Sequence, residues 1–167
     1  MGPAMPNRLL VGVLGHQHSG KSYTWNMLFG SEVRRGKYAR HLELRPHECV
    51  EVFLVSGSFE ERQEYAGDIL KNQNSRIVLC SLQYHDEVYD TLDYLVDNDF
   101  FLYIQWLNPG RTDPGQYWDR LGLANYILTA QSALTMRNGA IDARSRVQEI
   151  REFIYGWALY RNLIVPC

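Results

Sequence analysis

The sequence predicts a single α/β domain, spanning residues 1–167, around a mainly parallel central sheet. The chain has 167 residues, of which 46% are hydrophobic, and a chain of this length can bury one full core. Short apolar runs alternate with longer amphipathic ones, which is the α/β pattern. The short runs are almost continuously apolar, as strands are when a parallel sheet is buried on both faces.

The first half of the chain is expected to contain two strands and two helices. Residues 9–14 are an apolar run that predicts a buried strand, and residues 20–29 predict the helix that follows it. Residues 50–55 predict the second strand, and the amphipathic residues 60–71 predict the second helix. Residues 1–7, before the first strand, are expected to be flexible.

The second half continues the alternation. Residues 77–80 and 100–105 predict two more strands, with a helix over residues 87–96 between them. Residues 106–110 carry an Asn-Pro-Gly loop signal, and residues 111–135 have the least readable pattern. A helix over residues 142–163 is expected to close one face of the sheet. It carries a stripe at helical spacing, formed by Val147, Ile150, Ile154, Trp157 and Arg161.

Charge and cysteine content argue against several classes of protein. The chain has 17 Lys+Arg and 19 Asp+Glu, a net charge of −2. This balance argues against nucleic acid or an anionic membrane as the main partner. No apolar run approaches the roughly 18–20 residues that span a bilayer. The three cysteines, Cys49, Cys80 and Cys167, are scattered and form no C-x-x-C pair, so a reducing, cytoplasmic setting fits best.

One motif carries recognisable chemistry. Residues 15–22 have the sequence Gly-His-Gln-His-Ser-Gly-Lys-Ser and match G-x-x-x-x-G-K-S/T at each fixed position. The motif follows the first predicted strand and opens the first predicted helix, which is the context of a P-loop. In a P-loop the backbone N–H groups cradle phosphates, the lysine reaches the β- and γ-phosphates, and the hydroxyl ligates Mg²⁺.

We therefore expect a three-layer P-loop NTPase fold that binds ATP or GTP together with Mg²⁺. Ser22 is the expected metal ligand. The nucleotide-binding candidates are Gly15, His16, Gln17, His18, Ser19, Gly20, Lys21, Ser22 and Tyr23.

The sequence around this motif resembles the Ras-like and dynamin-like GTPases. Residues 19–22, followed by Asn26, Leu28 and Gly30, are similar to the G-K-S-x-x-x-N-x-L-x-G run with which many of those GTPases open their first helix. In that family an Asp after the next strand supports the Mg²⁺ ion, whereas here that strand runs into Ser-Gly-Ser at residues 56–58. The family's guanine-binding Asn-Lys-x-Asp is also absent, because Pro109 follows Asn108. The resemblance implies a degenerate GTPase-like protein and leaves the base open.

Besides a pseudo-enzyme that holds a nucleotide only as part of its structure, two functions remain open. In the first, bound nucleotide orders the Arg-rich residues 34–45 and presents a different surface to a protein partner or a second copy. In the second, the protein is a small-molecule or nucleotide kinase, in which Glu60 or Glu61 takes the proton of the acceptor. Residues 59–62, Phe-Glu-Glu-Arg, look a little like the acid–arginine pair of deoxynucleoside kinases. The catalytic candidates are Lys21, Glu61 and Arg40, an arginine of the 34–45 segment that is expected to fold over the γ-phosphate.

Two further groups of residues are open to a chemical interpretation. The turn-rich loop at residues 108–115 is either simple turn chemistry or a cradle for the base, with Trp106 or Tyr117 stacking on the ring. His16, His18, His47 and Cys49 form no zinc signature, so we expect no metal other than Mg²⁺.

Overall fold

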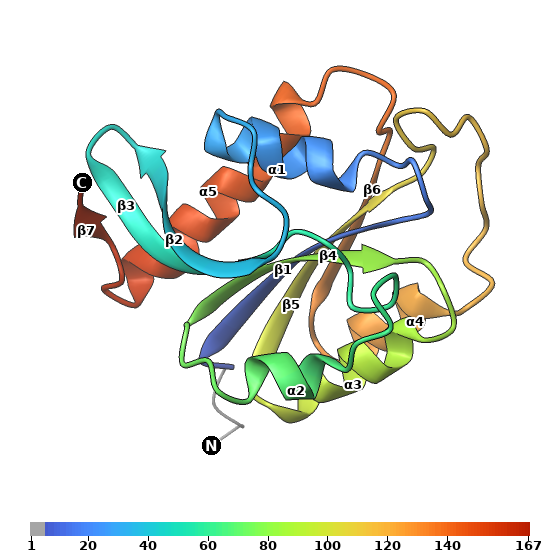
Figure 1. The fold of residues 1–167 in the computed structure, drawn as a ribbon, viewed down its shortest axis with the longest axis horizontal. Coiled ribbons are helices and arrows are strands. Elements are labelled where there is room, and N and C mark those ends of the chain that lie inside the picture. The colour runs from blue at the N-terminus through green and yellow to red at the C-terminus, as the bar shows by residue number, and fades with distance from the viewer. Residues whose placement is uncertain (1–5) are drawn as a thin grey trace.

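Helices cover both faces of a central sheet in the computed structural model, which describes residues 6–167 (Figure 1). The strands are β1 (Arg8–Gly15), β2 (Lys37–Arg45), β3 (Glu48–Val55), β4 (Ile77–Gln83), β5 (Phe100–Leu107), β6 (Ala133–Arg137) and β7 (Val165–Pro166). The helices are α1 (Lys21–Phe29), α2 (Ala66–Leu70), α3 (Val88–Asp97), α4 (Leu123–Thr129) and α5 (Arg144–Tyr160). The expected α/β class is confirmed.

The sheet is mostly parallel and has the strand order β2-β3-β4-β1-β5-β6. Strands β1, β3, β4, β5 and β6 run parallel to one another, whereas β2 and β7 run antiparallel to β3. β1 therefore lies between β4 and β5, and the strand order reverses around it. Open α/β sheets bind ligands at the carboxyl ends of their strands at such a reversal. The 15–22 loop starts at this point, where Gly15 pairs with Gln83.

Each face of the sheet has its own hydrophobic cluster. Helices α1 and α5 cover one face, and α2, α3 and α4 cover the other (Figure 1). Successive side chains of β1 alternate between them, with Val11 and Val13 in the first cluster and Leu10 and Leu14 in the second. This alternation explains why β1 is apolar over residues 9–14, as expected for a strand buried on both faces.

Helix α5 has 17 residues and buries the predicted stripe against the sheet. Val147, Ile150, Ile154 and Trp157 are buried, while Arg161 follows the helix and lies over the Trp157 ring at 3.4 Å. Among residues 6–167, no helix is long and apolar enough to cross a membrane. The expected flexibility of residues 1–7 concerns mainly residues 1–5, which are outside the described part. Asn7 is inside it and accepts a hydrogen bond from Arg76 Nε at 2.8 Å.

Several elements differ from the prediction. The Arg-rich segment contains β2, an edge strand that pairs with β3 from Lys37 to Arg45, and residues 111–135 contain α4 and the beginning of β6. The helix expected over residues 60–71 is only Ala66–Leu70. Gln63 has a φ of 53°, in the left-handed region, so a continuous right-handed helix cannot pass through it.

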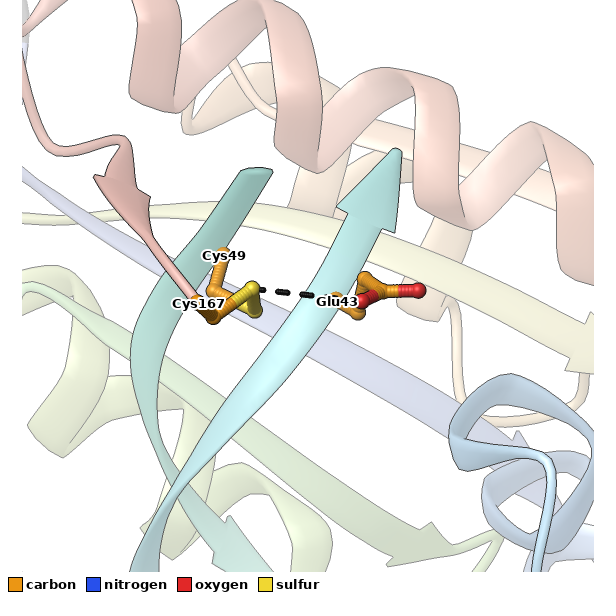
Figure 2. Close-up of side chains that lie close together, drawn as sticks. All are labelled: Glu43, Cys49 and Cys167. Atoms are coloured by element: carbon orange, nitrogen blue, oxygen red, sulfur yellow. Dashed lines mark hydrogen bonds between the residues drawn. A yellow bond between two sulfur atoms is a disulfide. The ribbon is translucent and has the colours of Figure 1, made fainter. Parts of the chain in front are cut away.

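Two of the cysteines form a disulfide, which the sequence analysis did not expect. Cys49 at the beginning of β3 is joined to Cys167 after β7, with their Cα atoms 5.8 Å apart (Figure 2). The two residues are 118 positions apart in the sequence, and only the pairing of Cys49 with Val165 in the sheet brings them together. The spacing of the cysteines along the chain therefore gave no indication that Cys49 and Cys167 would pair. Cys80 is buried and is a free thiol.

Candidate functional site

The 15–22 loop leads from β1 into α1 through two residues with positive φ. His18 has a φ of 65° and Gly20, the N-cap of α1, has a φ of 100°. Within the described residues, no side chain caps this helix, so the first N–H groups of α1 lack an intrahelical partner. They lie at a cavity of about 510 Å³ that is lined by residues 17–23 of the loop and helix. A free helix N-terminus attracts anions.

Lys21 is held by the loop itself. Its side chain is only 8% exposed, and Nζ donates hydrogen bonds to the carbonyl oxygens of Gly15 at 3.2 Å and His16 at 3.1 Å. Nζ also donates to Gln83 Oε1 at 2.8 Å and forms an ion pair with Glu61 Oε1 at 3.3 Å. Burial lowers the pKa of Lys21, and the charge of Glu61 opposes this shift. The ammonium group is thus fixed beside the cavity.

The cavity extends beyond the loop to other segments of the chain. It is also lined by Arg35, by Ser56 and Gly57 after β3, by Glu61 and Arg62, and by Ser81 of β4. The lining therefore has three cationic side chains, of Lys21, Arg35 and Arg62. Among the described residues, Glu61 is the only carboxylate that lines the cavity. This excess of positive charge suits a polyphosphate.

Of the three predicted catalytic residues, the structure brings two together. Lys21 and Glu61 form the ion pair described above, although they are 40 positions apart in the sequence. Arg40 lies elsewhere: its guanidinium group is 3.8 Å from the centre of the Phe29 ring, and it lines a different hollow. Arg40 is on β2, whereas Arg35 precedes that strand and is the arginine of the 34–45 segment that lines the cavity.

Glu60 and Glu61 have different surroundings despite being adjacent. Glu60 is 9% exposed, and neither of its carboxylate oxygens has a hydrogen-bond partner among the described residues. Burial raises its pKa to about 7. Glu60 lines a separate hollow with Glu64, Glu87 and Asp90. Only Glu61 of the two predicted proton acceptors therefore lines the cavity of the 15–22 loop.

Two side chains that line the cavity can offer an oxygen to Mg²⁺: the Ser22 hydroxyl, and Glu61 through Oε2, because its Oε1 is paired with Lys21. Ser22 is exposed and lines the cavity, as Glu61 does, and hydroxyl and carboxylate oxygens suit this ion. Ser81 is already engaged, because its Oγ accepts a hydrogen bond from Trp25 Nε1 at 2.8 Å and donates one to the Ser56 carbonyl oxygen at 3.0 Å. Ser22 and Glu61 would hold the ion, which would neutralise phosphate charge.

The loop after β5 closes over the 15–22 loop through backbone hydrogen bonds. The Arg111 N–H donates to the Ser19 carbonyl oxygen at 2.8 Å, and the Thr112 N–H donates to that of His18 at 3.1 Å. The Arg111 guanidinium group lies over the Tyr23 ring at 3.6 Å. Arg111 stands three residues after Asn108, where the guanine-binding motif would have its Asp. A guanidinium group there cannot accept hydrogen bonds from guanine.

The aromatic residues proposed to stack on a base stack on protein side chains instead. The ring of Tyr117 is 3.7 Å from that of His16, centre to centre, and Trp106 is buried and stacked on Tyr84 at 4.7 Å. His16 also lies against Tyr84 at 5.1 Å. This stack fixes the first part of the 15–22 loop, and burial lowers the pKa of His16.

Two polar side chains that hold the 15–22 loop and the first helix in place, those of Gln83 and Arg146, were not predicted from the sequence. Gln83 was not among the predicted site residues, yet it binds Lys21. Its place opposite Gly15 depends on the pairing of β1 with β4. Arg146 is buried, and its Nη1 donates to Thr24 Oγ1 at 2.7 Å, which links α5 to α1 beneath the loop. Nothing in the amphipathic pattern of α5 distinguishes Arg146 from a solvent-facing arginine.

No family model matches the chain, and no curated protein matches it either.

Proposed function

We propose that this chain is a P-loop NTPase-fold protein that binds a nucleoside triphosphate with Mg²⁺ through its 15–22 loop. One observation carries the proposal: the buried Lys21 ammonium and the free N-terminus of α1 adjoin the same cationic cavity. Fixed donors around an anion-sized space are what phosphate binding requires. The volume of about 510 Å³ is within the range of small-ligand sites.

We further propose that the nucleotide acts as a switch or is hydrolysed slowly, in the manner of a degenerate GTPase. Arg35 lies between α1 and β2, and Arg62 lies in the turns between β3 and α2. Both line the cavity, so a γ-phosphate can draw two irregular segments onto one ligand. Their order then depends on the nucleotide, and a protein partner or a second copy can read the difference. A cytoplasmic location stays a prediction.

The alternative function, a small-molecule or nucleotide kinase, is favoured by the extension of the cavity towards Arg62 and Glu61. A kinase needs a carboxylate that is free to take the acceptor proton. Glu61 is instead paired with Lys21, and Glu60 lines the other hollow. We therefore place the switch or slow hydrolase first, and the kinase second.

Thermal unfolding of the protein with ATP, GTP and their diphosphates, each with Mg²⁺, tests nucleotide binding. A nucleotide at 100 times its dissociation constant should add about 2.7 kcal/mol to the free energy of unfolding. Lys21→Ala should abolish the effect, because the loop loses its fixed cation. Lys37→Ala is the matched control, since Lys37 pairs with Glu64 away from this cavity.

The absence of any shift with folded, ligand-free wild-type protein would overturn the proposal, as would wild-type affinity in folded Lys21→Ala. Turnover assays then separate the two functions. Phosphate release without an acceptor supports the hydrolase, acceptor-dependent loss of the triphosphate supports the kinase, and binding without turnover supports the switch.

A further inference from the structure

The disulfide lies beside a carboxylate at the end of the sheet opposite the 15–22 loop. Glu43 on β2, Cys49 on β3 and Cys167 after β7 come from three different segments (Figure 2). One carboxylate oxygen and the two sulfur atoms all lie within 4.8 Å of one another. β3 begins at Glu48 and reaches the cavity of the 15–22 loop only near Ser56. The disulfide and this cavity are therefore separated by the length of the strand.

We propose that Glu43, Cys49 and Cys167 bind one thiophilic divalent metal ion, of the Zn²⁺ type, when the disulfide is reduced. Two thiolates and a carboxylate are ligands that Zn²⁺ accepts, with water in the fourth position of a tetrahedron. In such a tetrahedron, bond lengths of about 2.3 Å to sulfur and 2.1 Å to oxygen separate the two ligand atoms by about 3.6 Å. Cys167 Sγ and Glu43 Oε2 are 3.9 Å apart.

The segment that carries Cys167 can adjust to a metal ion. β7 is only two residues long, and its residues are both exposed. It is attached to β3 through two residue pairs, Glu48 with Pro166 and Cys49 with Val165, and the Cys167 N–H donates to the His47 carbonyl oxygen at 3.3 Å. Cys49, in contrast, is fixed in β3. When the disulfide is reduced, Cys167 is therefore the residue that moves, so that the two sulfur atoms reach the spacing of two metal ligands.

Solvent and ions can reach Cys49 although it is only 4% exposed. It lines a hollow of about 450 Å³ that also contains Arg40, Arg45 and Arg151. These cations favour the thiolate over the thiol. They also offset the single negative charge of a complex formed by two thiolates, one carboxylate and one divalent ion. Arg40 and Arg45 of the 34–45 segment, which do not line the cavity of the 15–22 loop, thus have an electrostatic role here.

The step balances without an oxidant. A phosphine reduces the disulfide, takes the oxygen atom of one water molecule to become its oxide, and leaves two thiols. On metal binding, two S–H bonds break, two metal–sulfur bonds form and two protons pass to the solvent. The disulfide and the metal complex exclude each other, because both use the same two sulfur atoms.

Titration of the phosphine-reduced protein with Co²⁺ under argon tests the proposal, because thiolate ligands give Co²⁺ a charge-transfer absorption. We expect one ion per chain, displaced by one equivalent of Zn²⁺. The absorption should be lost in Cys49→Ser and Cys167→Ser and retained in Cys80→Ser. Glu43→Gln should weaken binding about tenfold or more, since even residues that only support metal ligands cost this much when replaced.

Reduced wild-type protein without the absorption would overturn the proposal, and so would an absorption that survives in folded Cys49→Ser. Unchanged affinity in Glu43→Gln would exclude the three-ligand site. The oxidised protein should not bind the ion through sulfur. The test uses no nucleotide, so its outcome is independent of the function proposed for the 15–22 loop.

Discussion

Lys21 and Glu60 are both buried, and burial favours the neutral form of each: it lowers the pKa of Lys21 and raises that of Glu60. Lys21 has two carbonyl oxygens, an amide oxygen and a carboxylate around its ammonium group. The carboxylate of Glu60 has no such partners within residues 6–167. A buried carboxylate without hydrogen bonds favours its neutral form. Burial accordingly raises the pKa of Glu60 from 4.5 to about 7.

This shift predicts that stability falls as the pH rises. Between about pH 4.5 and 7 the folded chain retains the Glu60 proton, whereas the unfolded chain has lost it. Raising the pH through this window therefore favours the unfolded chain, by up to about 3 kcal/mol. Glu60→Gln should remove this part of the pH dependence. Urea unfolding of both proteins from pH 4 to 8 measures the difference.

Glu87→Gln is the control for this experiment, because Glu87 is an exposed acid that lines the same hollow. Its pH profile should run parallel to that of the wild type. If the Glu60→Gln profile were also parallel, Glu60 would titrate normally in the folded chain.

Both ends of α1 depend on a glycine in the left-handed backbone region. Gly20 and Gly30 bound α1, and both have positive φ, of 100° and 73°. They differ in their surroundings. A Cβ atom on Gly20 would lie 2.9 Å from Arg111 Cβ, whereas a Cβ atom on Gly30 would have nothing within 4 Å.

Alanine at the two positions should therefore have unequal effects. Gly30→Ala should lower the free energy of unfolding by about 1 kcal/mol, through backbone strain alone. Gly20→Ala should cost about 2–3 kcal/mol, because strain and the contact with Arg111 add. Denaturant unfolding measures both values. Equal losses would mean that the loop after β5 moves away at no cost.

The elements that were predicted are those in which one local rule decides the structure. β1 contains the apolar run of residues 9–14 and β4 the apolar run of residues 77–80, and the first helix follows a turn that contains two glycines. β2 was missed because its outward positions are charged and its inward residues, Leu42 and Leu44, form too short an alternation. β6 was missed because its residues are only partly buried. These strands depend on pairing with their neighbours, which the sequence does not display.

At the scale of the whole molecule, the disulfide joins the end of the chain to the sheet. It closes a loop of 118 positions, and a crosslink of this span restricts the unfolded chain strongly. Reduction should therefore lower the free energy of unfolding, by about 2–4 kcal/mol. Urea unfolding with and without a phosphine measures this loss. Cys167→Ser should be insensitive to the phosphine, and a sensitive variant would contradict the assignment.

The candidate site was predictable as far as its residues are contiguous. Residues 15–22 follow a recognisable pattern, and their place at the reversal of strand order agrees with it. Arg35 and Arg62 come to the cavity from two separate segments, and Gln83 comes to Lys21 from a third. Choosing Arg35 over Arg40 requires knowing that β2 begins at Lys37 and carries Arg40 away. Which arginine lies at the cavity depends on distances between segments in the folded chain, and the periodicity of the sequence does not give these distances.

The close packing around Ser19 has a thermodynamic consequence for any ligand of the loop. Cβ atoms on Gly110 and Gly139 would lie 2.6 Å from Ser19 Cα and 2.8 Å from the Ser19 carbonyl oxygen, respectively. Three segments far apart in the sequence therefore share one tight contact before any ligand arrives. A loop that is already shaped loses little conformational entropy on binding. The conformational entropy of the loop is lost when the chain folds and not when the ligand binds. The contacts around Ser19 therefore contribute both to the stability of the fold and to the affinity for the ligand.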